Sequence, residues 1–265
     1  MAFGINSAGN IVGEQNNSAF FLPLGGSPQM VAIPAGATAA FGINDQNNVV
    51  GQYVLGSVTP GFFVAGPGAN NFIRINAPAG PNTVNAQGIN NGGFLVGFYV
   101  GADGQDHGFK ANVQNANNGV LTGTAIADPT IPIVPGEPGA TFVFSQVLGL
   151  NDNGIAVGYY GDSTTSQHGF FYNTNTGVYT FLDDPSEQFN NGVEVTQITG
   201  INNTGEIAGF YSDAAGVFHG FVGCPVGVTC PPVAPAPEPS SFVLGSAGLA
   251  LVALARFRRR RSAEA

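Results

Sequence analysis

The sequence has no tryptophan, only two cysteines and very little charge, since Asp, Glu, Lys and Arg make up 9% of its 265 residues. Soluble domains usually contain about a quarter of charged residues. Five of the seven basic residues lie in the last ten positions. Residues 1–235 therefore hold only Arg74 and Lys110 against fourteen carboxylates, a net charge of −12. Such a body repels phosphate backbones, which argues against nucleic-acid binding.

Residues 1–222 also lack any capped helical period. Hydrophobic residues nevertheless make up 43% of the chain, enough to bury a sizeable core, which excludes disorder throughout. The 40 glycines follow no collagen triplet, which excludes that fibre. These absences leave an all-β body.

A ten-residue pattern, Gly-[Ile/Leu]-Asn-x-x-[Gly/Asn]-x-[apolar]-[Val/Ala]-Gly, occurs five times. Gly and Asn between β-branched residues indicate tight hairpins, because both residues adopt positive φ at low cost. Each copy therefore predicts two strands joined by a short turn. The copies begin at Gly4, Gly42, Gly88, Gly149 and Gly200. The turn asparagines are Asn6, Asn44, Asn90, Asn151 and Asn202.

Each hairpin is followed by a Phe-containing third strand, and four of the five copies continue into a segment that ends in proline, a residue that cannot donate to a strand ladder. The prolines are Pro34, Pro78, Pro129 and Pro185. Four short strands in about 40–50 residues form the blade of a β-propeller. We therefore expect a five-bladed β-propeller, with an open β-solenoid or sandwich array as the alternative fold.

The strand count leaves one blade a strand short, and propeller rings often close with strands from both chain ends. The opening residues Met1-Ala2-Phe3-Gly4 do not resemble a secretory signal peptide. Both features favour a missing strand and leader upstream of Met1, through a misassigned start or a fragment.

The C-terminal part has three segments in a fixed order. Residues 231–239 are rich in proline and form a stiff linker. Residues 240–255 are uncharged and apolar; they are shorter than the usual span of about 20 residues, but membrane thinning and long basic side chains compensate. The arginines that follow place this end in the cytoplasm and residues 1–235 outside. These arginines are Arg256, Arg258, Arg259, Arg260 and Arg261.

This tail resembles the PEP-CTERM sorting signal, a segment also labelled ice-binding protein C-terminal domain. The resemblance covers the motif Pro237-Glu238-Pro239, the apolar run and the arginine cluster. It implies export from a Gram-negative bacterium, inner-membrane tethering until an exosortase processes the chain, and a link to exopolysaccharide or biofilm. The repeats over residues 3–222 are similar to the HAF family of extracellular repeats, which implies no particular activity.

Cys224 and Cys230 precede the proline-rich linker. Two cysteines without a histidine cluster cannot supply the four ligands of tetrahedral zinc. A local disulfide fits an exported chain, and two reduced thiols are the alternative.

Three histidines, each before the Gly-Phe of a third strand, raise the question of a shared metal site. Equivalent positions in adjacent blades are too far apart for one zinc ion, so we interpret the histidines as blade-packing residues that bond a neighbouring carbonyl. The three are His107, His168 and His219.

The turn pairs Asn44-Asp45, Asn151-Asp152 and Asn202-Asn203 contain oxygens that calcium accepts. No EF-hand or calcium β-roll motif is present, and asparagines that bond their own turn explain the pattern without an ion. We therefore expect neither a metal nor another cofactor.

Catalytic candidates are sparse, because no nucleophile elbow, zinc-protease motif or phosphate loop occurs. A glycan hydrolase would need two carboxylates in one pocket; the candidates are Asp162, Asp183, Asp184 and Asp213. A glycan-binding propeller would need exposed aromatic rings; the candidates are Tyr99, Tyr159, Tyr160 and Tyr211. Half-buried blade contacts explain the same tyrosines.

The sequence thus predicts a propeller over residues 1–223, a Cys- and Pro-rich linker over 224–239 and a transmembrane sorting segment over 240–261. The expected function is that of a non-catalytic cell-surface or extracellular-matrix protein. A lectin-like propeller and a secreted glycan hydrolase are the two alternatives.

Overall fold

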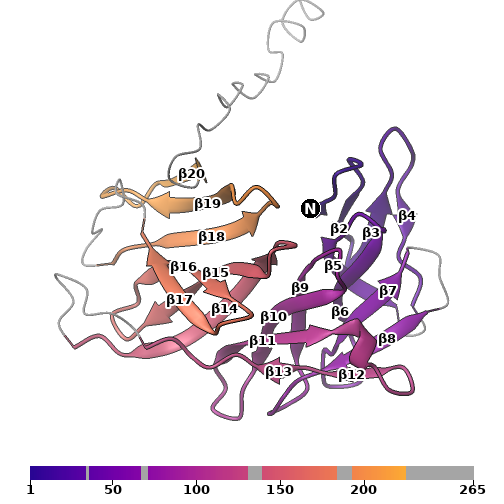
Figure 1. The fold of residues 1–265 in the computed structure, drawn as a ribbon, viewed down its shortest axis with the longest axis horizontal. Helices are drawn as coiled ribbons and strands as arrows, with labels where there is room; N and C mark the ends of the chain where they lie inside the picture. Colours follow the sequence, from indigo (N-terminus) through magenta and orange to yellow (C-terminus); the bar gives the residue numbers. More distant parts are fainter. Residues whose placement is uncertain (34–35, 67–70, 131–138, 184–192, 225–265) are drawn as a thin grey trace, which may run out of the picture. The chain divides into compact units, whose positions relative to one another are not determined.

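The computed structural model describes residues 1–33, 36–66, 71–130, 139–183 and 193–224. These residues belong to one compact unit, residues 1–226. They form five successive sheets in a β-propeller arrangement, and the strands within each blade are antiparallel (Figure 1). The structure thus confirms an all-β fold of five blades in a propeller arrangement.

Each sheet is one blade, and its strands follow the chain order from the inner to the outer edge. Blade 1 contains β1 (Ala2–Ile5), β2 (Ile11–Gln15), β3 (Ser18–Leu22) and β4 (Gln29–Met30). Blade 2 contains β5 (Ala37–Ile43), β6 (Asn48–Tyr53), β7 (Gly61–Ala65) and β8 (Phe72–Asn76). Blade 3 contains β9 (Val84–Ile89), β10 (Phe94–Val100), β11 (Asp106–Asn112) and β13 (Thr124–Ala125). Blade 4 contains β14 (Phe142–Leu150), β15 (Ile155–Asp162), β16 (Gln167–Asn173) and β17 (Val178–Leu182). Blade 5 contains β18 (Thr196–Ile201), β19 (Ile207–Ser212) and β20 (Phe218–Gly223).

The connection after blade 3 is more elaborate than the repeat pattern indicates. A 3-10 helix, η1 (Val113–Asn115), follows β11. The next strand, β12 (Val120–Thr122), pairs in parallel with the outer strand β8 of blade 2. This pairing ties two blades together through their outer edges.

Every first hairpin contains a β-bulge, which explains the glycine that ends each repeat. The register between the two strands shifts once just before the first glycine of the repeat, for example between Val147 and Gly149. A Cβ atom on the opposing Gly158 would lie 2.0 Å from the Gln146 carbonyl oxygen. Only glycine therefore allows the two backbones to approach this closely.

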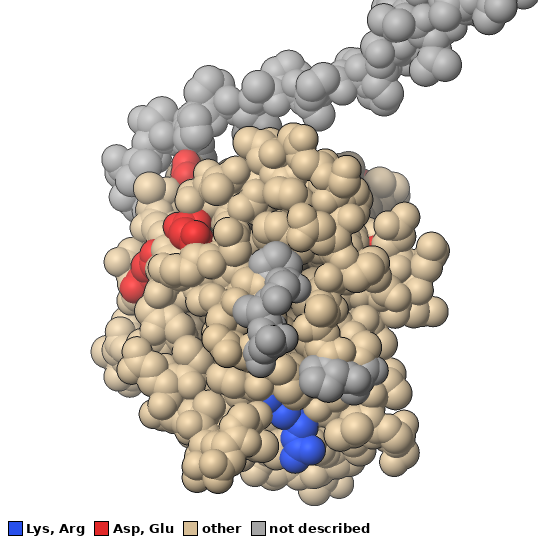
Figure 2. All heavy atoms as spheres, turned by 90° about the vertical axis from the view of Figure 1, so that its right-hand side faces the viewer, with Lys and Arg blue, Asp and Glu red and all other residues tan. Residues whose placement is uncertain are grey.

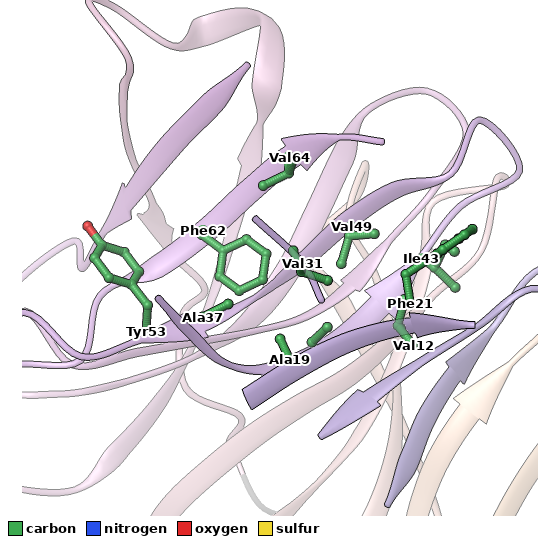
Figure 3. Close-up of a cluster of buried hydrophobic side chains, with 11 residues drawn as sticks. Val12, Ala19, Phe21, Val31, Ala37, Ile43, Val49, Tyr53, Phe62 and Val64 are labelled. Carbon is green, nitrogen blue, oxygen red and sulfur yellow. The ribbon is translucent and has the colours of Figure 1, made fainter. Parts of the chain in front are cut away.

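The core consists of apolar clusters between successive blades rather than one central cluster. Figure 3 shows the cluster between blades 1 and 2, where Val12 and Phe21 meet Val49 and Phe62. Val12, Val49 and Phe62 are fully buried. Burial of one such side chain contributes about 1.5–3 kcal/mol, so each blade depends on its neighbours for stability.

The surface matches the composition. Figure 2 shows a face on which charged side chains are few and uncharged residues cover most of the area. In the described ranges, no helix has the length and apolarity needed to cross a bilayer. The predicted membrane segment 240–255 lies outside those ranges, so it stays a prediction.

Candidate functional site

The turns of all five first hairpins meet at one axial pocket of about 400 Å³. Three neighbouring positions of the repeat line it: an aliphatic residue, the repeat asparagine and the residue after it, which we call the rim residue. The aliphatic layer and the rim take a residue from every repeat, and the asparagine position contributes from every repeat but the fourth. The aliphatic layer consists of Ile5, Ile43, Ile89, Leu150 and Ile201.

Each repeat asparagine closes its own turn. In blade 2, Asn44 Oδ1 accepts hydrogen bonds from the backbone N–H groups of Gln46 and Asn48 at 3.1 and 2.9 Å. Asn47 occupies the turn position with φ of 61°, where the other four repeats place glycine. The side-chain acceptor and the positive φ together explain why Asn and Gly recur in this turn.

The same asparagines also join the blades, a role that the repeat pattern alone did not reveal. The Nδ2 group donates to the backbone carbonyl of the equivalent asparagine in the next blade. The four bonds are Asn6 to Asn44 (3.0 Å), Asn44 to Asn90 (3.0 Å), Asn90 to Asn151 (3.2 Å) and Asn151 to Asn202 (3.2 Å). One side chain therefore fixes both the turn and the angle to the next blade.

The rim forms a second chain of hydrogen bonds around the pocket, in which each backbone N–H donates to the rim side chain of the next blade. The bonds run from Ser7 to Asp45, Asp45 to Asn91, Asn91 to Asp152 and Asp152 to Asn203, at 2.7–2.9 Å. The Ser7 hydroxyl and N–H, with the Asn91 amide, lower the pKa of Asp45. These bonds occupy the carboxylates considered for calcium, and the described residues contain no group of three His, Cys, Asp or Glu positioned for a metal ion.

Each of the three histidines lies within ion-pair distance of an aspartate, a partner that the sequence-based interpretation did not name. His107 Nδ1 lies 3.0 Å from Asp128 and its Nε2 lies 3.1 Å from Asp103. Burial lowers the pKa of His107, but the hydrogen bonds and charges of these two aspartates outweigh that effect and raise it. The imidazole thus bridges the loop before β11 to the segment that ends at Pro129.

Blades 4 and 5 repeat this arrangement. The fully buried His168 forms ion pairs with Asp162 at 3.5 Å and Asp183 at 3.3 Å, and His219 lies 2.8 Å from Asp213. Asp162 and Asp183 therefore flank one buried histidine in blade 4, whereas Asp213 pairs with a histidine in blade 5. Asp184 lies outside the described residues.

A tyrosine stands beside each histidine because the two residues are direct cross-strand partners. The pairs are Tyr99–His107, Tyr160–His168 and Tyr211–His219, with ring centroids 5.0–5.8 Å apart. The sequence contains a signal for this unit, because an aspartate precedes each histidine by four or six residues.

The tyrosines considered for sugar stacking do not form an exposed aromatic face. Tyr99, Tyr159 and Tyr160 are buried, and Tyr211 is half-buried. Tyr159 donates its hydroxyl proton to Gln146 at 2.7 Å, and burial raises the pKa of Tyr159 to about 12. The structure therefore supports the interpretation of these residues as blade contacts.

The remaining predictions from the sequence concern residues at the C-terminus. Cys224 is the last described residue and Cys230 lies outside the described part, so the disulfide stays a prediction. The motif Pro237-Glu238-Pro239 and the five arginines also lie outside it.

Comparison with family models decides the nature of this tail. Residues 235–261 match the PEP-CTERM protein-sorting motif. The motif indicates an exosortase-sorted protein destined for the cell surface or the extracellular space. No curated protein sequence matches the chain.

Several solved structures are similar to this chain. TolB from Acinetobacter baumannii aligns with a TM-score of 0.52 and 10% identity over 84% of this chain and 53% of its own, so this chain spans about half its length. A streptogramin B lyase aligns with a TM-score of 0.45 and 13% identity, over 83% and 68% of the two chains. A fungal lectin from Aleuria aurantia gives 0.41 and 10%, over 87% and 78%. At these identities the likeness shows the fold alone.

Proposed function

We propose that this chain is a non-catalytic structural component of the cell surface or extracellular matrix, delivered by its PEP-CTERM tail. The observation that carries the proposal is the sorting motif at residues 235–261. In this proposal residues 240–255 hold the chain in the inner membrane, with the body outside the cytoplasm. An exosortase then processes the chain near Pro237-Glu238-Pro239, and the released body associates with exopolysaccharide.

The body's polar groups support a structural role. The repeated asparagines close turns and join blades, and the rim side chains bond one another. The histidines engage the carboxylates that a hydrolase would need. Catalysis requires such groups to converge on an accessible substrate site, whereas the two carboxylates of blade 4 flank a fully buried histidine.

The test follows the fate of the tail in a host that has an exosortase. A reporter that is active only in the periplasm replaces the residues before the sorting segment. The sizes of the products are then measured by immunoblot. We expect reporter activity and a shortened product that persist in Glu264→Ala, the control outside the motif. Replacement of Pro237-Glu238-Pro239 by alanines should leave the long, membrane-bound form. Activity confined to the cytoplasm, or equal processing of both variants, would contradict the proposal.

Sugar binding is a second candidate, and one observation favours it. The axial pocket combines an aliphatic layer with a rim of amide, carboxylate and hydroxyl groups, and sugars present both apolar faces and hydroxyl groups. Glycan-array binding that disappears in Ile89→Asp, but persists in Val178→Asp on the exposed outer strand, would support it. Release of reducing sugar by the purified chain would favour the hydrolase alternative instead.

A further inference from the structure

The contact that joins successive blades is made four times, and blade 5 has no counterpart of it within the part of the chain that the structure describes. Asn202 Nδ2, which would donate to a following blade, donates instead to Glu206 of its own turn. Among the described residues, the backbone N–H of Asn203 has no hydrogen-bond acceptor, although its four equivalents each reach the next rim side chain. The polar side of blade 5 is therefore left open.

The first glycine of each repeat shows the same difference. A Cβ atom at Gly4 or Gly42 would lie 2.7 or 2.5 Å from a carbonyl oxygen of the next blade. At Gly88 and Gly149 the backbone of the next blade lies within 3.0 and 3.3 Å of such an atom. At Gly200 no atom of the described residues lies within 4 Å of such an atom. The first glycine of the repeat thus contacts the backbone of the next blade in blades 1–4, whereas in blade 5 it has no such neighbour among the described residues.

Apolar residues at both ends of the blade series are also more exposed than their equivalents in the other blades. The ninth residue of the repeat is fully buried in blades 1–4, but its equivalent in blade 5, Ala208, is exposed. On the opposite end, Ile5 of blade 1 is 67% exposed, whereas Ile43 and Ile89 are less than a tenth exposed. The buried ninth residues are Val12, Val50, Val96 and Val157.

We propose that the sector between blade 5 and blade 1 receives one further four-stranded blade of the same Gly-Ile/Leu-Asn repeat. Such a unit offers blade 5 a carbonyl for Asn202 and a rim oxygen for Asn203. It offers blade 1 an amide for the Asn6 carbonyl and an aliphatic neighbour for Ile5.

A single blade suits the sector because Asn6 and Asn202 line the same axial pocket. A whole second copy docked on blade 5 would direct its later blades into the space that blade 1 occupies. In blades 1–4 the outer strand leads into the inner strand of the next blade, so a repeat that precedes β1 has the right direction. This inference concerns the body and holds whether or not the chain is sorted.

Thiol accessibility tests whether the sector is open. Single cysteines are placed at Ile5→Cys and Ala208→Cys in the full chain, with Cys224 and Cys230 changed to serine. Val157→Cys, the buried equivalent of Ala208 in blade 4, is the reference. We expect fast alkylation at the two end positions and slow alkylation at the reference. Slow alkylation at both ends would overturn the proposal, because the ring would then close on itself or on a second copy.

A designed sixth repeat tests the occupant. A copy of residues 37–83, blade 2 with its connection, is fused ahead of Ala2. The control fusion carries Val50→Asp and Phe62→Asp within the added copy only. We expect alkylation of both end cysteines to fall to the rate of the reference in the first fusion and to stay fast in the control. Unchanged rates with a folded added repeat, shown by circular dichroism, would overturn the proposal. Protection that depends on protein concentration would also overturn it, because a second copy would then be the occupant.

Discussion

Replacing Asn44 by alanine should destabilise the body more than the same change at Asn202. Asn44 is buried, and alanine removes the acceptor for two turn N–H groups and the donor to the Asn90 carbonyl. Loss of a comparable side-chain cap costs about 0.5–2 kcal/mol. A buried group that loses its hydrogen-bond partner costs roughly 1–3 kcal/mol. The Asn90 carbonyl still accepts a hydrogen bond from the Gly93 N–H, so we add only the lower part of this range to the cost of the lost cap. We therefore expect a loss of about 2–3 kcal/mol for Asn44→Ala.

Asn202 closes its turn in the same way, but it is exposed and joins no following blade. We expect Asn202→Ala to cost about 1 kcal/mol, the cap alone. Urea unfolding followed by tyrosine fluorescence gives both free energies, since the chain has seven tyrosines and no tryptophan. Equal losses in the two variants would refute the assignment of the extra stability to the bond between blades.

Three other variants test the packing and the electrostatics. The raised pKa of His107 means that its ion pairs stabilise the fold fully below the unfolded pKa of about 6.5 and are lost as the pH rises through the higher folded value. His107→Gln should therefore lower the melting temperature more at about pH 5.5 than at about pH 9, and equal shifts would contradict this. Val96→Ala should cost about 2–3 kcal/mol by denaturant unfolding, whereas Val222→Ala, at a half-exposed site, should cost less than about 0.5. Gly158→Ala should cost about 3 kcal/mol or prevent folding, because its Cβ atom would overlap a carbonyl oxygen, while Gly220→Ala should be nearly neutral by the same measurement.

The local fold could be read from the sequence because it depends on short-range chemistry. The Gly and Asn positions specify the hairpin turns, and the proline-ended segments correspond to outer strands such as β8 and β17. The number of repeats equals the number of blades. The sorting tail could also be recognised, since its signal lies in the order of three neighbouring segments.

Other features could not be read because they depend on residues far apart in the chain. The partners of His107 and His168 lie on two sides of each ring, and one partner of each comes from another strand. The tyrosines considered for sugar binding are buried by neighbouring strands, which a repeat pattern does not reveal. The parallel pairing of β12 with β8 joins residues more than forty positions apart.

The sequence by itself determined the all-β class, the five hairpins and the sorting signal, because turn conformation and segment order are local properties. Only the tertiary structure decided what the repeat asparagines do beyond their own turns. Their Nδ2 groups find acceptors 38 to 61 residues away, in the next blade. It also decided that blade 5 and blade 1 present unpaired faces, because the burial of a repeated residue depends on whether another blade stands beside it.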